Sequence, residues 1–306
     1  MRRLKIVHRT FYNFPDVVQL EPHRLLLRPR ADHEVRIESS ALEISPTASL
    51  RWLRDVYGNS VAIATFEAAA QQLSVQSEVI VQHFNDAPLD FVVSEYAVNY
   101  PFAYESNELP ILSPFLQLQD RTDSNVLKTW VQSFSSPGTM QTYVLLQNIC
   151  SGIHQSFTYK VREEPGVQTI AETLAMNTGS CRDFANLFME AARSLGLAAR
   201  FVSGYLYAPA AMAANAGATH AWAEVYLPGA GWMGFDPTLG VMTNNDHIAV
   251  AVARLPESVP PIAGSYVGPP GATLNVGVWV SELAPKDFDS AQLSPGNSAS
   301  QAQAQA

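Results

Sequence analysis

The segment from Thr178 to Gly196, TGSCRDFANLFMEAARSLG, constrains the fold of this chain more than any other stretch. Its apolar residues recur every three or four positions, as in a helix with one buried face: Phe184, Leu187, Phe188, Ala191, Ala192 and Leu195. Ser180 is a favourable N-cap, Asp183 occupies the partner position of a capping box, and Gly196 supplies a stop signal. The pattern predicts a core helix whose first residue is Cys181.

A cysteine in this position has a chemical advantage. The thiol of Cys181 would face free backbone N–H groups and the positive end of the helix dipole, and both favour the thiolate. A single cysteine near a helix start is more often a small core residue. The residues that follow in the chain favour a nucleophile instead.

The composition limits the classes of function. A chain of 306 residues, 47% hydrophobic and 15% charged, is long enough to bury a full core and to form two domains. Its net charge of −9 disfavours binding to nucleic acid, which requires a basic surface. No apolar run has the length of a transmembrane helix or of a signal peptide, and two cysteines cannot form a disulfide framework. We therefore expect a reduced, cytoplasmic protein that binds neither nucleic acid nor a membrane.

The first 88 residues show the alternation typical of strands. Strands are expected at 3–12, 34–45, 49–56, 60–67 and 73–84, with hairpin residues at Asp55–Asn59. We interpret residues 1–88 as an antiparallel β-sandwich. The run Leu26–Arg30 could dock another segment, although its chemistry does not require this. The histidines of this region lack metal-ligand spacing, and we expect them at the surface or at sheet edges: His8, His23, His33 and His83.

The rest of the chain divides into three regions. Residues 89–123 combine prolines with aromatic residues, which predicts a connector that packs against a second domain. Residues 124–289 are assigned to a catalytic core, in which helices are followed by strands at 199–207, 219–227, 231–236, 247–253 and 272–282. Cys150 lies among apolar residues of a predicted helix and is expected to be a buried structural thiol. Residues 290–306 are polar and of low complexity, which predicts disorder.

A predicted hairpin places two further polar residues beside each other. If Pro228 lies near the centre of its turn, residues whose numbers sum to about 456 face each other, so His220 opposes Asp236 and Glu224 opposes Trp232. Alternate residues share one face of a sheet, and a slip of one residue would separate His220 from Asp236. The sequence therefore predicts that both side chains project from the same face of the hairpin.

These residues have the chemistry of a Cys–His–Asp triad. Cys181 would attack a carbonyl, His220 would exchange the proton, and Asp236 would fix the imidazole and stabilise its charged form. The backbone N–H of Cys181 is the natural first oxyanion donor, and Tyr159 is a candidate second donor. Trp222 could cover the site or be a large core residue. The architecture that this arrangement requires, a helix start against an antiparallel sheet, is that of papain-like folds, so we expect an α+β protein.

Four segments of the sequence resemble proteins of the transglutaminase-like superfamily. The first two, GSCRDFANLFMEAARSLGLAARFVSGYL and THAWAEVYLPGAGWMGFDPT, are similar to its core. Residues 1–88, with the motifs H-x-T-x-Y, LRPR and DVYGN, resemble the bacterial transglutaminase-like N-terminal region, and residues 246–264 resemble the segment that closes such bacterial proteins. The resemblance implies Cys181 as nucleophile, His220 as base and Asp236 as orienting acid. Asn186 departs from the family pattern, where a histidine is common, and so does VARLPESVPP, where a more acidic and aromatic run is usual.

The alternatives differ in the fate of the acyl group. Many prokaryotic members are described as candidate cysteine proteases, so we favour hydrolysis of a peptide or amide bond through a thioester, with transamidation of protein glutamine as the second hypothesis. A non-catalytic binding module on a relic site is the third. No cofactor or metal is expected, since three ligands are too few for a structural zinc site and no oxygen-rich calcium loop is visible. The expected partner is a peptide or protein that donates an amide acyl group, and residues 96–118 and 210–218 are the expected lips of its cleft.

Overall fold

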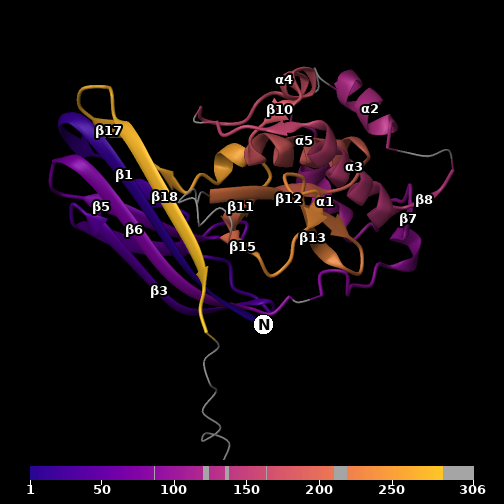
Figure 1. Cartoon of the computed structure of the whole chain (residues 1–306), viewed down its shortest axis with the longest axis horizontal. Coiled ribbons are helices and arrows are strands. Elements are labelled where there is room, and N and C mark those ends of the chain that lie inside the picture. Colours follow the sequence, from indigo (N-terminus) through magenta and orange to yellow (C-terminus); the bar gives the residue numbers. More distant parts are fainter. Residues whose placement is uncertain (86, 120–123, 135–137, 163, 210–218, 285–306) are drawn as a thin grey trace, which may run out of the picture.

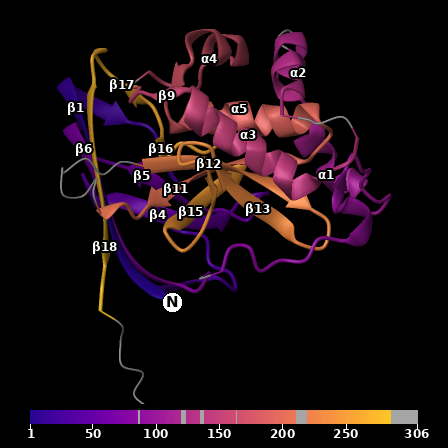
Figure 2. The same ribbon diagram turned by 45° about the vertical axis from the view of Figure 1, so that its right-hand side comes forward.

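The computed structural model describes residues 1–85, 87–119, 124–134, 138–162, 164–209 and 219–284. Two antiparallel sheets form the N-terminal part, and helices pack on a third antiparallel sheet in the part that follows (Figure 1, Figure 2). The predicted α+β class is thereby confirmed. The tail at 290–306 and the loop at 210–218 lie outside the described residues. Within the described ranges, no helix has the length and apolar character needed to cross a membrane.

The N-terminal sheets are organised around one long strand, β1 (Arg2–Leu20). It pairs with β6 (Ala70–His83), which in turn pairs with β3 (Val35–Ser45). The second sheet contains β2 (His23–Leu25), β4 (Ala48–Arg54) and β5 (Ser60–Phe66). Inward-facing residues of both sheets share one apolar core, among them Phe14, Leu25, Ala62 and Val75. The alternation read from the sequence thus corresponds to one buried and one more exposed face on each sheet.

The last described strands return to the N-terminal sheets. β18 (Thr273–Glu282) pairs antiparallel with β1, from Asn13 opposite Thr273 to Leu4 opposite Glu282 (yellow beside indigo in Figure 1). β17 (Tyr266–Val267) pairs with the other end of β1, and β16 (Ile262–Ala263) pairs with β2. Residues 262–282 fall within the region 124–289 that is assigned above to the catalytic core, but the structure pairs the strands they form with the N-terminal sheets. Alternating hydrophobicity identifies a strand but does not say which sheet it joins.

The connector contacts the core through buried aromatic residues. It contains η1 (Glu95–Ala97), β7 (Asn99–Tyr100) and α1 (Leu109–Leu116). Tyr104 is buried; its hydroxyl accepts the N–H of Ala198 at 2.9 Å and donates to the carbonyl of Tyr226 at 2.9 Å. These contacts are those expected of a packed connector.

The third sheet lies under the predicted cysteine helix. Its strand order is β14-β13-β12-β11-β15, and the strands are β11 (Ala199–Leu206), β12 (Thr219–Leu227), β13 (Gly231–Asp236), β14 (Val241–Met242) and β15 (His247–Ala253). The remaining elements are α2 (Ser124–Gln132), β8 (Met140–Gln141), α3 (Thr142–Ser156), β9 (Thr158–Tyr159), α4 (Ile170–Met176), β10 (Thr178–Gly179), α5 (Cys181–Ser194) and η2 (Pro256–Ser258). α5 packs directly on the sheet, and the ring of Phe188 stacks on Phe235 with centroids 5.3 Å apart. The helix predicted from Cys181 onward is present and central.

The two N-terminal motifs hold β15 from the side opposite α5. Asn59 brackets one residue of β15: its Nδ2 donates to the carbonyl of Val252 at 2.8 Å, and its Oδ1 accepts the N–H of Val252 at 2.9 Å. The backbone N–H of Arg30 donates to the carbonyl of Ala249 at 2.8 Å, and its guanidinium donates to Asn59 Oδ1 at 2.8 Å. The run Leu26–Arg30 and the turn Asp55–Asn59 therefore join the N-terminal sheets to an edge strand of the third sheet.

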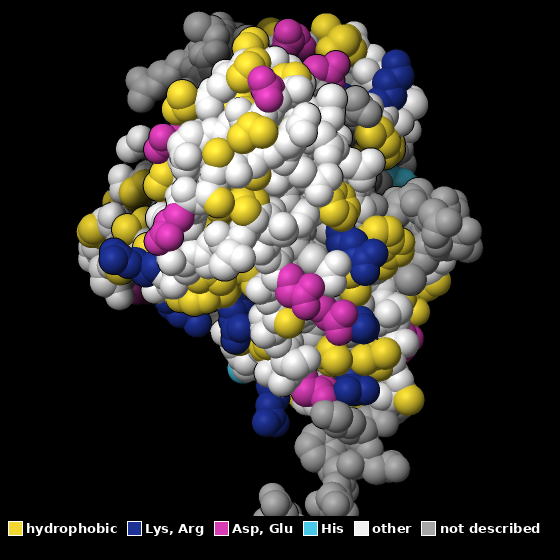
Figure 3. All heavy atoms as spheres, turned by 90° about the vertical axis from the view of Figure 1, so that its left-hand side faces the viewer, with side chains coloured by type: hydrophobic (Ala, Val, Ile, Leu, Met, Phe, Trp, Pro, Cys, Tyr) yellow, Lys and Arg dark blue, Asp and Glu magenta, His cyan; other side chains and the backbone are white. Residues whose placement is uncertain are grey.

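The outer face of the N-terminal part mixes both signs of charge. Figure 3 shows basic and acidic side chains interspersed with hydrophobic ones on this side of the molecule. Among the ion pairs of the N-terminal sheets, Lys5 on β1 pairs with Glu78 on the adjacent β6 at 2.8 Å, and Arg3 on β1 pairs with Glu38 on β3 at 2.7 Å. This face does not present the continuous basic surface that a phosphate backbone requires.

Three of the four N-terminal histidines are buried, contrary to expectation. His8, His23 and His83 are all at most 7% exposed, whereas His33 is exposed. His8 lies on β1 where the N-terminal sheet meets β11: its Nδ1 lies 3.0 Å from the Tyr205 hydroxyl and its Nε2 3.0 Å from Thr10 Oγ1. In an alternating pattern, a polar residue is expected to face solvent. Here β11 of the third sheet covers His8.

The burial of His8 gives the protein a pH-dependent stability. Burial lowers the pKa of His8 from 6.5 to about 4. The unfolded chain binds a proton near pH 6.5 and the folded one does not, so stability falls as the pH drops from 6.5 to 4 by about 3 kcal/mol from this group. We expect His8→Gln to flatten the pH dependence of the free energy of unfolding over this range, as measured by urea titration. An unchanged slope would show that His8 is not the responsible group.

Candidate active site

The start of α5 is held by a buried carboxylate. Asp183 Oδ2 accepts the backbone N–H of Ser180 at 2.8 Å and its hydroxyl at 2.7 Å, the return bond of the predicted capping box. Asp183 Oδ1 accepts from Arg162 and from the N–H of Gln168, both at 2.7 Å. Burial opposes ionisation of Asp183, but these hydrogen bonds outweigh it and lower its pKa. The helix start is thereby fixed to the loop in front of it.

Cys181 enters the helix from a short parallel ladder. β10 pairs with β9, with Gly179 opposite Tyr159, and the chain turns directly into the helix at Cys181. Gly179 is required here, because a Cβ would lie 2.9 Å from the Cβ of Asp183 and 3.0 Å from the ring of Phe184. The thiol-bearing residue is 8% exposed. It is thus at the edge of the core rather than deep within it.

The hairpin register differs from the expected one by two residues. Glu224 faces Gly234 and Tyr226 faces Trp232, so paired numbers sum to 458 rather than 456. The turn is centred on Gly229, whose φ of +86° is a conformation that glycine adopts readily, and not on Pro228. The expected direct pairing of His220 with Asp236 and of Glu224 with Trp232 was therefore wrong. Because side chains alternate with a period of two, this shift leaves them on the same face.

The structure brings the three predicted residues together. His220 Nε2 lies 2.6 Å from Asp236 Oδ2, which leaves Nδ1 for the hydrogen bond that His220 makes with Cys181. Burial disfavours the imidazolium, but the charge of Asp236, its hydrogen bond and the contact with Cys181 outweigh this and raise the pKa of His220. Burial likewise acts against the Asp236 carboxylate, and His220 and the hydrogen bonds overcome it and lower its pKa. The geometry suits His220 as a base, because Asp236 stabilises its charged form through Nε2 while Nδ1 faces Cys181.

A second imidazole, absent from our expectations, binds the same carboxylate. His247, at the start of β15, is 4% exposed, and its Nε2 lies 3.1 Å from Asp236 Oδ2. The DHIAVAVA block contained this residue, but nothing in the sequence connected it with a hairpin ending at residue 236. His220, Asp236 and His247 offer ligand atoms within 4.8 Å of one another. However, Oδ2 touches both imidazoles directly and occupies the place between them that a metal ion would need, so the set is a hydrogen-bonded cluster.

Tyr159 and Trp222, the two other residues assigned to the site, differ in exposure. Tyr159 is 48% exposed and close enough to Cys181 to interact with its charge; burial and that charge raise the pKa of Tyr159, so its hydroxyl remains a donor at neutral pH. Trp222 is 2% exposed and packs with Val202 and Val252. Its ring centroid also lies 6.1 Å from that of His220, so Trp222 is a buried residue that packs beside the candidate site.

Cys150, the second cysteine, and Asn186, which differs from the family pattern, are both buried. Cys150 lies on α3 with its Sγ 3.7 Å from the carbonyl of Val241, and burial, together with the charge of Asp236, raises its pKa. This matches the expected structural thiol. Asn186 is 4% exposed, and its Oδ1 has no hydrogen-bond partner among the described residues.

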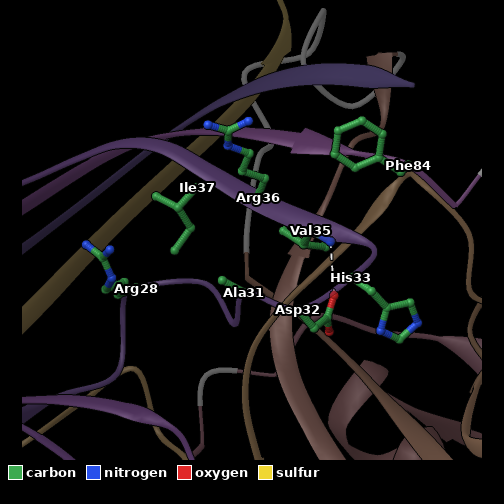
Figure 4. Close-up of a pocket in the computed structure, with 8 residues that line it drawn as sticks. All are labelled: Arg28, Ala31, Asp32, His33, Val35, Arg36, Ile37 and Phe84. Carbon is green, nitrogen blue, oxygen red and sulfur yellow. Dashed lines mark hydrogen bonds between the residues drawn. The ribbon is translucent and has the colours of Figure 1, made fainter. Parts of the chain in front are cut away.

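A hollow of about 510 Å³ lies elsewhere, beside the start of β3 (Figure 4). Asp32 there caps the strand start by accepting the N–H of Val35 at 3.0 Å. The residues that line the hollow are Arg28, Ala31, Asp32, His33, Val35, Arg36, Ile37 and Phe84. None of the predicted site residues lines it, so it is not the candidate active site.

Comparison with known proteins gives two family matches and several full-length relatives. Residues 128–237 match the Transglutaminase-like superfamily, and residues 4–82 match the Bacterial transglutaminase-like N-terminal region. An uncharacterized protein of Mycobacterium bovis is 30% identical over 293 residues, 91% of this chain and 92% of its own length. One of Mycobacterium leprae is 25% identical over 292 residues, 93% of this chain and all of its own length. The crystal structure of a "putative cysteine protease" from Cytophaga hutchinsonii superposes with a TM-score of 0.70 at 18% identity, covering 93% of this chain and 92% of that one.

Proposed function

Because this chain belongs to the transglutaminase-like superfamily, we propose that it is an acyl-transfer enzyme that uses Cys181 to cleave a peptide or amide bond through a thioester. The observation that carries this proposal is the buried hydrogen bond of 2.6 Å between His220 Nε2 and Asp236 Oδ2. That bond fixes the imidazole with its other nitrogen toward a thiol at a helix start. An inert core cysteine has no need of such a partner.

The proposed reaction has two halves. The sulfur of Cys181 attacks the carbonyl carbon, and the C=O electron pair moves to oxygen, where the N–H of Cys181, unused by the helix, can donate to it. Collapse expels the amine, which takes its proton from the His220 imidazolium, and leaves a thioester. Water then attacks the thioester carbonyl while His220 accepts a proton from it. The C–S bond breaks, the carboxylic acid departs, and the sulfur of Cys181 takes its proton back from the His220 imidazolium.

Tyr159 is proposed as the second oxyanion donor. It is on β9, which pairs with the strand that leads into Cys181, and half of its side chain is exposed to an approaching substrate. Its raised pKa keeps the hydroxyl protonated, as a donor must be. Loss of one such donor typically costs about 10²- to 10³-fold in kcat.

Hydrolysis is favoured over transamidation by the description of the structural relative from Cytophaga hutchinsonii as a "putative cysteine protease". Both reactions share the acyl-enzyme and differ only in the acceptor. The intact set of Cys181, His220 and Asp236 argues against a relic site, because nothing selects for a buried ion pair beside an unused thiol. The proposed substrate is a peptide or protein amide.

The test is capture of the acyl-enzyme. The protein is mixed with a peptide library in H₂¹⁸O, with or without methylamine, quenched in acid and examined by mass spectrometry. We expect an acyl adduct on the Cys181 peptide and ¹⁸O-labelled acids as products. Methylamide products in place of labelled acids would identify a transamidase. If neither peptides nor p-nitrophenyl acetate modify Cys181, the proposal is refuted.

A further inference from the structure

We infer that His247 is a positioning residue of the proposed site: it donates a second N–H to the carboxylate oxygen of Asp236 that binds His220, and so fixes the orienting group itself. The inference rests on the proposed function, since it assigns His247 a role in the reactivity of Cys181. It extends the site from three residues on the helix and hairpin to a strand that the N-terminal sheets hold in place.

The proton positions follow from the chemistry of the carboxylate. An ionised carboxylate oxygen only accepts hydrogen bonds. His220 Nε2 at 2.6 Å and His247 Nε2 at 3.1 Å from the same Oδ2 must therefore both carry protons. On the other side of the ring, Nδ1 of His247 lies 3.2 Å from both the backbone nitrogen and the side-chain Oδ1 of Asn244, so it can accept from the first in the neutral ring or donate to the second in the charged one; Nε2 carries a proton in both cases. The Nε2 proton is thus directed at Asp236.

With His247 in place, both oxygens of Asp236 are occupied. Oδ1 accepts the N–H of Thr238 at 2.8 Å and that of Leu239 at 3.3 Å, and Oδ2 accepts from the two imidazoles. A buried carboxylate with two donors on each oxygen is held in one rotamer and kept ionised. Without His247, the only donor to Oδ2 would be His220. Because His220 is the residue that Asp236 orients, it cannot also fix the position of Asp236.

His247 is itself seated by the N-terminal part of the chain. His83, at the end of β6, has its Nε2 3.1 Å from the carbonyl of His247. Arg2 forms an ion pair with the neighbouring Asp246. The indole of Trp222 packs edge-on against the imidazole, with ring centroids 5.3 Å apart. Through His83 and Arg2, the N-terminal sheets therefore hold the strand whose first residue, His247, binds Asp236.

Other ionisable groups surround this cluster and must be counted in any pH dependence. Cys150 faces Asp236 from α3, Tyr159 faces Cys181 from β9, and His83 approaches His247 from β6. Arg182 acts on Tyr159, while Asp32 and Asp246 act on His83. None of these groups lies within the hydrogen bonds that join His247, Asp236 and His220 in the described structure.

Two substitutions of similar size separate positioning from packing. In His247→Gln the side-chain amide can place an N–H where Nε2 lies, whereas in His247→Asn the shorter amide reaches only the Nδ1 position, near Asn244. The readout is the rate of Cys181 alkylation by iodoacetamide against pH, which needs no substrate. We expect His247→Asn to move the midpoint of the acid limb upward by about one pH unit, so that alkylation below it slows about tenfold. The physical reason is that Asp236, held by one donor fewer on Oδ2, orients and stabilises the His220 imidazolium less well, so the imidazolium in turn stabilises the Cys181 thiolate less.

The controls assign each outcome. His247→Gln should keep the wild-type midpoint, and so should His8→Gln, which removes a buried histidine that does not touch Asp236. Equal midpoints for His247→Asn and wild type, in protein with a native circular dichroism spectrum, would overturn the role of His247 and leave the proposed function standing. If the Asn variant does not fold, His247→Met takes its place, because its unbranched side chain offers no N–H to Asp236: a midpoint raised by about one pH unit supports the role, and the wild-type midpoint contradicts it. If wild-type Cys181 reacts no faster than Cys150, the proposed function itself fails.

Discussion

Replacing Cys181 by alanine should abolish turnover of an amide substrate, whereas replacing Cys150 by alanine should leave it. The first change removes the only atom that can carry the acyl group, and loss of such a nucleophile typically lowers kcat by about 10⁴-fold or more. The second removes a thiol whose pKa is raised by burial and which contacts the carbonyl of Val241. The measurement is the rate of product formation by each purified variant on a peptide identified in the acyl-enzyme experiment.

The comparison is informative because both cysteines are buried. Cys181 is 8% exposed and Cys150 is inaccessible, and each belongs to the same core cluster. A general effect of removing a core thiol would therefore lower the activity of both variants, with a matching loss of melting temperature. Equal activity of the two variants would refute the assignment of Cys181.

Asp236→Asn should lower kcat by about 10³- to 10⁴-fold while the protein remains folded. Without the negative charge, burial still opposes the imidazolium while the largest opposing influence is lost, so the pKa of His220 falls. The amide cannot satisfy its neighbours either. Its NH₂ would face either the N–H groups of Thr238 and Leu239 or the two imidazole N–H groups that now bind Oδ2.

The matched control for this change is Glu224→Gln on the same hairpin. Glu224 pairs with Arg200 at 2.6 Å and makes no contact with the candidate site among the described residues, so its neutralisation should leave kcat unchanged. The rates of both variants and their melting temperatures provide the comparison. A similar loss of rate in Glu224→Gln, or none in Asp236→Asn, would mean that the Asp236 charge is not what supports His220.

Local chemistry was readable from the sequence wherever one short segment determined it. The start of α5 at Cys181 follows from Ser180, Asp183 and an apolar stripe, and the structure contains each of these features. The shared face of His220 and Asp236 survived an error of two residues in register because a strand alternates with a period of two. Such features depend on neighbours in the chain, and the sequence contains them directly.

Features that depend on distant segments could not be predicted in this way. The pairing of β18 with β1 and the burial of His8 both require knowing which surfaces meet. His247 is the clearest case, because its partner Asp236 lies on a different strand and its seat is completed by His83, far earlier in the chain. Each of these positions has an ordinary local pattern, and its role arises only in the folded protein.

The most direct measurement is alkylation of the native wild-type protein by iodoacetamide at pH 6.5, with the two cysteine peptides quantified by mass spectrometry over time. An ordinary thiol is only about 1% thiolate at this pH, so a cysteine activated by His220 and Asp236 should react about 100-fold faster than an unactivated one. If His220 and Asp236 activate Cys181, it is modified at least about 100-fold faster than Cys150. Equal rates for the two thiols would contradict it.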